Sequence, residues 1–283
     1  MVKTAAQNLI KPLIFSLLSI VFVISIFPIL YIILASFKTN AEILTSGANI
    51  FPARFLTENY AKAWNLANFK LYTWNSIYMS FFIVIGSIIT ATTLAYVFDR
   101  GVFAGKKFLF GLLLSTMFIA LGTSSLFPQL QVAKLFGLHT SLWGVIVVRV
   151  LGINVSLVFV AKGYLATIPK EIDEAAKIDG CGFIGIYWRI IFPLLKPLIA
   201  TIGLLSFRAA WNDYLLPLVF TLTNPNKSPL IVGVINLMNT GDSASSWNLM
   251  LAATTIAIVP MLTVYLILNK YFITGLMSGA VKG

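Results

Sequence analysis

The sequence predicts an all-α polytopic membrane protein with six transmembrane helices and both termini in the cytoplasm. Of its 283 residues, 59% are hydrophobic and 10% are charged, and the mean hydropathy is +0.92. Soluble domains contain about 45–50% apolar and about 25% charged residues, so this composition argues against a soluble globular enzyme. The net charge of +11 fits cytoplasmic loops beneath anionic lipid, and no nucleic-acid partner is expected.

Six long and nearly uncharged stretches are the predicted spans, since an α-helix needs about 20 apolar residues to cross a bilayer. Irregular backbone facing lipid would leave polar groups unsatisfied, and these runs are too long for barrel strands. The predicted spans are residues 12–37, 71–98, 108–131, 142–161, 197–221 and 247–269.

The orientation follows from the positions of Lys and Arg. Lys3 and Lys11 precede the first span, which lacks the features of a cleaved signal peptide and is expected to be retained. With the N-terminus inside, twelve basic residues fall on the inner side, six on the outer side and two within spans. Cytoplasmic loops carry the excess of positive charge. The tight turn with Arg100, Lys106 and Lys107 is the strongest local evidence for cytoplasmic termini.

The inner connection, residues 163–196, holds four of the nine acidic residues of the chain. Pro169 and residues 170–179 predict a short helix, with Pro169 in its first turn, where a missing N–H is harmless, and Gly180 as its stop. Residues 183–192 predict a second amphipathic segment that ends at the following proline. A helix of about ten residues is marginal alone in water. The residues leave open whether it packs in a cleft of another protein or on the membrane surface.

This connection carries a recognisable motif: Glu174-Ala175-Ala176, three residues, Gly180, nine residues, Ile190, one residue, Phe192 and Pro193. It resembles the EAA motif, EAA-x3-G-x9-I-x-LP, of permease subunits of ATP-binding cassette (ABC) importers. Only Phe192 departs, where the family prefers leucine. The resemblance implies the type I ABC importer permease fold, with one transmembrane domain over residues 1–283. It implies that the loop couples transport to an ATPase through Glu174, Ala175, Ala176, Asp179, Gly180, Ile190 and Pro193.

Three further segments resemble the smaller, six-span permease of maltose and oligosaccharide importers. They are Pro52 with Thr57-Glu58-Asn59-Tyr60 in the first outer loop, Trp211-Asn212-Asp213-Tyr214 in the fifth span, and the ending from Lys270 to Gly283. This resemblance implies a sugar or oligosaccharide as the substrate and a prokaryotic cell membrane as the location.

The chain lacks the phosphate-loop pattern G-x-x-x-x-G-K-[ST], so it is not expected to hydrolyse ATP. It is not expected to bind a cofactor or a metal. The resemblance implies that ATP and Mg are used by separate ATP-binding subunits, and that the chain pairs with a second homologous permease in the lipid membrane. An extracellular solute-binding protein is expected to dock on the outer loops, residues 38–70 and 224–246.

Ionisable residues within spans are candidates for the translocation pathway, because burying charge in a membrane is costly. Arg208, Asn212 and Asp213 lie in the fifth predicted span and Arg149 in the fourth. Two readings are open. Either Asn212 and Asp213 line the route of the sugar, or Asp213 is neutralised by Arg208 or by a neighbouring subunit.

Other functional classes are weighed against this one. A secondary transporter or channel would work without an ATPase, but the sequence shows no paired inverted repeats, and carboxylates within spans are scarce beyond Asp213. A permease for a non-sugar solute would keep the EAA motif. A membrane enzyme would need a cluster of catalytic groups, and the chain has one cysteine, Cys181, and one histidine, His139.

Overall fold

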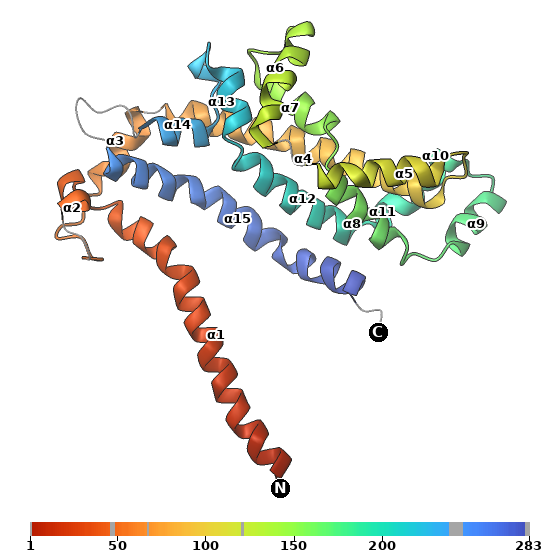
Figure 1. Ribbon diagram of the computed structural model, residues 1–283, viewed down its shortest axis with the longest axis horizontal. Helices are drawn as coiled ribbons and strands as arrows, with labels where there is room; N and C mark the ends of the chain where they lie inside the picture. Colours follow the sequence, from red (N-terminus) through yellow and green to blue (C-terminus); the bar gives the residue numbers. More distant parts are fainter. Residues whose placement is uncertain (1, 46–48, 67, 120–121, 238–245, 281–283) are drawn as a thin grey trace. The chain divides into compact units, whose positions relative to one another are not determined.

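The chain is described here from a computed structural model, which covers residues 2–45, 49–66, 68–119, 122–237 and 246–280. The elements in these ranges are helices (Figure 1), as the sequence predicts. They form two compact units, residues 1–69 with 233–258 and residues 70–232 with 259–283. Part of the outer loop expected to dock a solute-binding protein, residues 238–245, and the last three residues of the C-terminal motif lie outside the described ranges.

The first unit contains one long helix and two short ones, together with the start of the last helix. Its elements are α1 (Val2–Ala35), α2 (Asn40–Thr45), α3 (Glu58–Leu66) and the first part of α15 (Trp247–Ala280). Most of the large apolar side chains of α1 from Leu13 to Leu30 are exposed within this chain, as expected of a helix that faces lipid or other subunits.

A buried asparagine ties this unit together. Asn59, at the start of α3, donates from Nδ2 to the carbonyl oxygens of Ser36 at 2.8 Å and Lys38 at 2.9 Å, just beyond the end of α1. Its Oδ1 accepts from Asn248 Nδ2 of α15 at 3.1 Å. Tyr60 and Ser36 add a hydroxyl–hydroxyl bond of 2.6 Å. Asn59 and Tyr60 of the predicted sugar-importer segment therefore join three helices.

The second unit is built on a helix of 32 residues, α4 (Phe69–Arg100). Shorter helices follow it, namely α5 (Lys106–Ser115), α6 (Leu126–Leu135), α7 (Leu142–Leu151), α8 (Val155–Leu165), α9 (Glu171–Ile178), α10 (Phe183–Ile186), α11 (Phe192–Leu194), α12 (Lys196–Trp211), α13 (Leu215–Thr221) and α14 (Leu230–Asn236). Helices α10 and α11 are joined by a π-helical stretch, η3 (Tyr187–Ile191).

Among the described residues, three helices are long and apolar enough to cross a membrane: Lys11–Ala35, Phe69–Arg100 and Trp247–Asn269. These match the first, second and sixth predicted spans. Two bent pairs would raise the number to five if each is one span: α7 with α8, bent by 47°, and Phe183–Leu194 with α12, bent by 79°. The count of six and the cytoplasmic location of both termini stay predictions.

The three middle predicted spans are not continuous helices, and here the structure corrects the sequence analysis. Span 108–131 breaks after α5, where the hydroxyls of Ser115 and Thr116 donate to carbonyls three residues back, and Gly122 has a φ of 53°. Such hydroxyls offer the backbone an alternative to the helical ladder. Hydropathy alone does not register breaks of this kind.

The other two breaks also lie at polar residues. Span 142–161 breaks between α7 and α8, where Ile153 has a φ of 29° and Asn154 caps α8 by accepting from the Leu157 amide. Span 197–221 breaks between α12 and α13, where Asn212 Nδ2 donates to the Arg208 carbonyl at 2.9 Å. At both breaks the asparagine side chain adds a second hydrogen bond to a backbone group that also has a backbone partner, so each break is held by a local side chain–backbone contact.

Two apolar clusters hold the second unit together. One joins the start of α4 to α7 and α13 through Met79, Val145 and Phe220. The other joins the end of α4 to α8, α9, η3 and α12 through Tyr96, Ala161, Ala176, Ile191 and Ile202. The second cluster packs against the predicted EAA loop, so the loop is seated on the helices that precede and follow it.

Candidate functional site

The first helix of the EAA loop, α9, has a well-defined beginning and end. Glu171, Asp173 and Glu174 lie in its first turn, where the helix dipole favours negative charge. At its end the Cys181 amide donates to the Ala176 carbonyl at 2.9 Å and the Gly180 amide to the Lys177 carbonyl at 3.0 Å. Gly180 has a φ of 81°. This is a Schellman stop, and it confirms the predicted short helix.

Helix α9 has one face turned into the chain and one turned away from it. Asp173 and Ala176, three residues apart, are buried, and Ala176 is only 4% exposed within the second apolar cluster. Glu174, Ala175 and Asp179 are exposed, as is Gly180. Ala176, the second alanine of the motif, thus packs inside this chain. Ala175, the first alanine, lies with the acidic residues Glu174 and Asp179 on the face that a partner can reach.

The second segment of the loop runs further than the sequence predicts. Helical structure continues from Phe183 through Pro193 to Leu194. The π-helical stretch η3 lies just before Pro193, and its altered hydrogen-bond pattern accommodates a residue without an N–H. Ile190 is half-buried against the second cluster and Pro193 is exposed. The prediction that this segment ends at Pro193 is therefore wrong by one residue.

Tyr187 fastens this second segment to α4. Its hydroxyl lies 2.8 Å from Thr92 Oγ1 and accepts from Thr93 Oγ1 at 3.2 Å. Its ring also packs against that of Tyr96, with ring centroids 5.2 Å apart. Sequence reasoning did not single out these residues.

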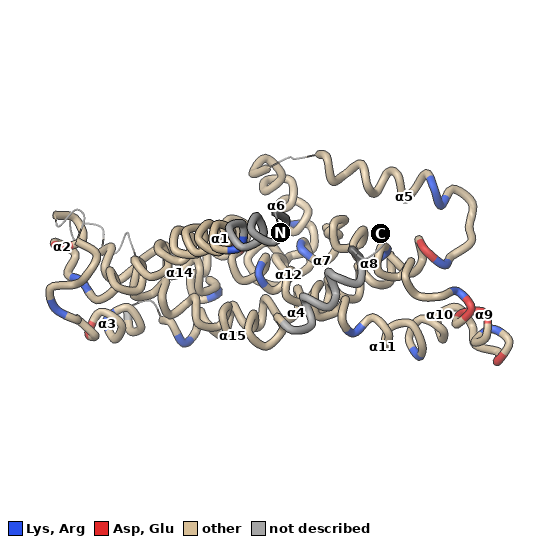
Figure 2. The backbone as a smooth tube through the Cα atoms, turned by 90° about the horizontal axis from the view of Figure 1, so that it is seen from below, with Lys and Arg blue, Asp and Glu red and all other residues tan. Residues whose placement is uncertain are grey.

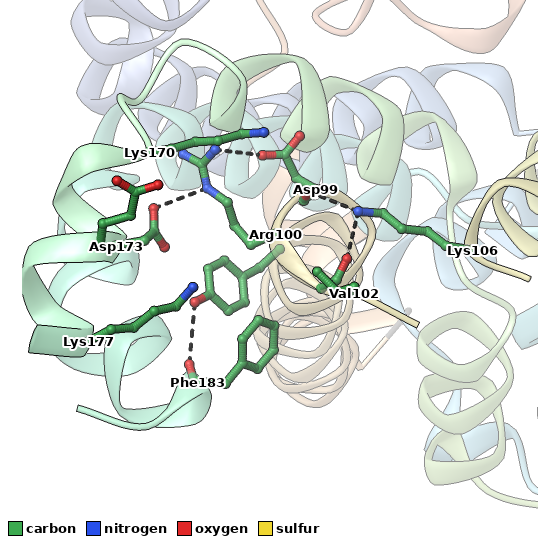
Figure 3. A pocket seen from close by; sticks show the side chains of 11 residues that line it. Asp99, Arg100, Val102, Lys106, Lys170, Asp173, Lys177 and Phe183 are labelled. Carbon is green, nitrogen blue, oxygen red and sulfur yellow. Dashed lines mark hydrogen bonds and ion pairs between the residues drawn. The ribbon is translucent and has the colours of Figure 1, made fainter. Parts of the chain in front are cut away.

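An ion cluster anchors α9 to the end of α4 (Figure 3). Arg100, the last residue of α4, lies with its Nε 3.2 Å from Asp173 Oδ2 and with Nη1 3.1 Å from Asp99 Oδ2. Its Nη2 donates to the carbonyl oxygens of Ile168 at 2.6 Å and Leu165 at 3.4 Å. The Arg100 and Asp173 side chains are each 6% exposed. A buried charge is stable only when paired and hydrogen-bonded.

In the sequence, Arg100 stands out only as a basic residue of an inner turn, and Asp173 only as one of the four acidic residues of the loop. The sequence nevertheless indicates that Asp173 is buried, because it lies three residues before Ala176, on the partly apolar face of a helix. A carboxylate on such a face needs a cationic partner. The sequence does not say which of the loop cations supplies it.

Acidic and basic residues gather at α9 in Figure 2. They border a hollow of about 210 Å³, whose charged lining residues are Asp99, Arg100, Lys106, Lys170, Asp173, Glu174 and Lys177. Within the described ranges, no group of three or more His, Cys, Asp or Glu side chains is arranged to hold a metal ion.

The second candidate site is a polar cavity between the broken helices of the second unit. Arg149 Nε donates to Asp213 Oδ2 at 2.6 Å, joining the end of α7 to the break after α12. Two adjoining hollows of about 460 and 440 Å³ share Gln129, Arg149, Asn212 and Asp213 as lining residues. The breaks in all three middle spans thus contribute to one polar cavity.

The structure brings together three of the four predicted pathway residues. Arg149, Asn212 and Asp213 line the cavity. Asp213 pairs with Arg149, so the suggested pairing of Asp213 with Arg208 does not form. Arg208 is exposed, and it takes part through its carbonyl oxygen, which accepts from the Asn212 side chain.

Fold and sites together define a helical multi-pass membrane protein that holds a short helix outside its spans and a polar cavity among broken helices. Residues 62–277 match the model of the family "Binding-protein-dependent transport system inner membrane component". The chain belongs to this family. It is a permease subunit of an ABC importer, located in the plasma membrane.

Two relatives illustrate the similarity. The chain is 35% identical to the melibiose/raffinose/stachyose import permease protein MelC of Bacillus subtilis, over 83% of this chain and 84% of the relative. It is 31% identical to the galactooligosaccharides transport system permease protein GanQ of the same organism, over 96% of each chain. A bacterial ABC transporter involved in import of the acidic polysaccharide alginate has the same fold, with a TM-score of 0.80 over 94% of this chain and 98% of that one at 24% identity.

Proposed function

We propose that this permease passes a sugar or oligosaccharide across a prokaryotic cell membrane, paired with a second homologous permease. An extracellular solute-binding protein delivers the substrate. Separate ATP-binding subunits use ATP and Mg and dock on α9, while this chain binds no cofactor of its own. The support for the substrate class is that relatives over most of the chain are named for oligosaccharide import.

The observation that carries the docking proposal is the arrangement of α9. Its outer face presents Glu174 and Ala175 and ends at the exposed Gly180, while its inner face is held by Asp173 and Ala176. A helix that is fixed on one face and exposed on the other can pass a displacement to the helices beneath it. The polar lining of the cavity, with three amide side chains and an ion pair, suits the hydroxyl groups of a sugar.

The test is purification of the tagged chain from its own membranes, followed by mass spectrometry. We expect an ATP-binding subunit and a second permease to be recovered, and the reconstituted complex to take up an oligosaccharide only with ATP. Glu174→Lys and Gly180→Asp should abolish uptake while the chain remains inserted. Recovery of the chain with only itself would contradict the proposal.

A matched control is available in the first unit. Glu58 is also an exposed acid in the first turn of a helix, α3, where it pairs with Lys62 at 3.1 Å. Exposed pairs of this kind contribute little to stability. Glu58→Lys should therefore leave the ATP-binding subunit bound, and loss of that subunit in the control would show that the Glu174→Lys result is not specific to α9.

A further inference from the structure

One guanidinium group joins three segments of the second unit. Arg100 ends α4, the second predicted span, and its Nη2 donates to the carbonyls of Leu165 at the end of α8 and of Ile168 just beyond it. Its Nε faces the carboxylate of Asp173 on α9 at 3.2 Å. The planar fork of arginine allows one side chain to serve several acceptors at once. Lysine, with a single charged nitrogen, cannot reproduce this set of contacts.

The end of α4 is itself held in place. Lys106 Nζ donates to the carbonyls of Asp99 at 3.0 Å and Gly101 at 2.8 Å, and so caps the C-terminal end of α4. Asp99 contacts Arg100 from the side opposite Asp173 (Figure 3). The backbone that carries Arg100 is thus held in place, and the guanidinium group is held between Asp99 on one side and Asp173 of α9 on the other.

Helix α9 depends on few other contacts. It has eight residues, and a helix of that length is not stable alone in water. Asp173 and Ala176 are its buried residues. The contact of Ala176 is apolar and permits sliding, whereas the ion pair of Asp173 does not, because separation would leave the buried Asp173 carboxylate without its cation while Arg100 stays paired with Asp99.

We infer that Arg100 and Asp173 are positioning residues, which convert movement of α9 into movement of α4 and α8. This inference rests on the proposed function, in which an ATPase moves α9. Neither residue touches the substrate. If the link is broken, α9 still docks on the ATPase, but its displacement is no longer passed to the spans. ATP hydrolysis then continues with less transport for each ATP consumed.

The experiment compares Arg100→Gln, Asp173→Asn and Asp173→Glu in the complete reconstituted complex, with uptake and ATP hydrolysis measured together. For Arg100→Gln and Asp173→Asn we expect the substrate transported per ATP to fall by about 2- to 30-fold, the range by which substitutions in a coupling network act. Asp173→Glu keeps the charge and should retain most of the coupling. Lys162→Gln is the control, since Lys162 lies on α8 and its ion pair in the same cluster is with Asp99 of α4, at 3.8 Å.

A second readout follows the position of α9 directly. The only cysteine, Cys181, is replaced by serine, and spin labels are placed at the exposed residues Val102 and Ile178. In a complex without other reactive cysteines, the distance distribution between the labels should be narrow, and it should broaden in Arg100→Gln.

The outcomes separate the possible roles. If Arg100→Gln only lowers the yield of complex, with unchanged transport per ATP and an unchanged distance distribution, the residues stabilise the fold and the inference is wrong. If the unsubstituted complex binds no ATPase or transports nothing with ATP, the proposed function itself fails. The inference would also be wrong if Asp173→Asn and the control Lys162→Gln transported the same amount of substrate per ATP.

Discussion

The Arg149–Asp213 ion pair leads to a prediction about which partner is costlier to remove. The two side chains meet at 2.6 Å, but they differ in environment: the Arg149 side chain is 44% exposed and that of Asp213 is 8% exposed. Arg149→Gln leaves an almost buried carboxylate without its cation. Asp213→Asn leaves a partly exposed guanidinium that still has an amide oxygen to bond to.

The difference in exposure sets the magnitudes. Removing one partner of a buried pair costs about 3–5 kcal/mol, and we take about 3 kcal/mol for Arg149→Gln because the stranded carboxylate is buried. For Asp213→Asn the stranded group is partly exposed, and the cost resembles that of an exposed pair, about 1 kcal/mol or less. The two variants should therefore differ by about 2 kcal/mol. That corresponds to about 4–8 °C, at about 2–4 °C per kcal/mol for chains of 150–250 residues.

The assay is the temperature at which half of the detergent-solubilised protein is lost from the monodisperse peak of a size-exclusion column. Such unfolding is irreversible, so the order of the variants is compared. Arg149→Gln should be the least stable, Asp213→Asn close to the unsubstituted chain, and the double variant more stable than Arg149→Gln alone. An Arg149→Gln protein as stable as Asp213→Asn, or a double variant without recovery, would refute the reasoning.

Two further predictions concern glycines. Gly180 adopts the left-handed conformation with open space around it, so Gly180→Val should destabilise the end of α9 by about 1–2 kcal/mol. Gly180→Asn should cost less, because asparagine tolerates this conformation. Equal melting temperatures of the two variants would contradict this prediction. At Gly144 a methyl group would overlap the Leu138 carbonyl oxygen and lie 2.6 Å from Phe220 Cε1, so Gly144→Ala should lose about 1–3 kcal/mol. Gly111→Ala in open space should instead stabilise its helix by up to about 1 kcal/mol, and a melting temperature of Gly144→Ala at or above that of Gly111→Ala would show that the contact yields.

Much of the fold could be predicted from local pattern. Long apolar runs identify the first, second and sixth spans, because a helix in lipid satisfies its own backbone and needs only length and apolarity. The Pro169 and Gly180 signals fix the ends of α9 within one residue, since capping depends on neighbours in sequence. The EAA motif is equally local, and it led to the permease family that the comparisons confirm.

Breaks in the middle spans could not be predicted from hydropathy. Ser115, Asn154 and Asn212 each make a hydrogen bond from the side chain to the backbone near a break. Such residues also occur within unbroken helices, and the choice depends on whether tertiary packing supports a turn at that point.

The sequence by itself determined the class of protein, the long spans and the position of the EAA loop, because these depend on composition, periodicity and residues close in the chain. Tertiary structure alone decided which charges meet. It pairs Asp213 with Arg149 and not with Arg208, and it brings Asp173 to Arg100 across more than seventy residues of chain. Both pairings depend on how helices distant in sequence pack, and a charged residue in a sequence does not indicate which residue it will pair with.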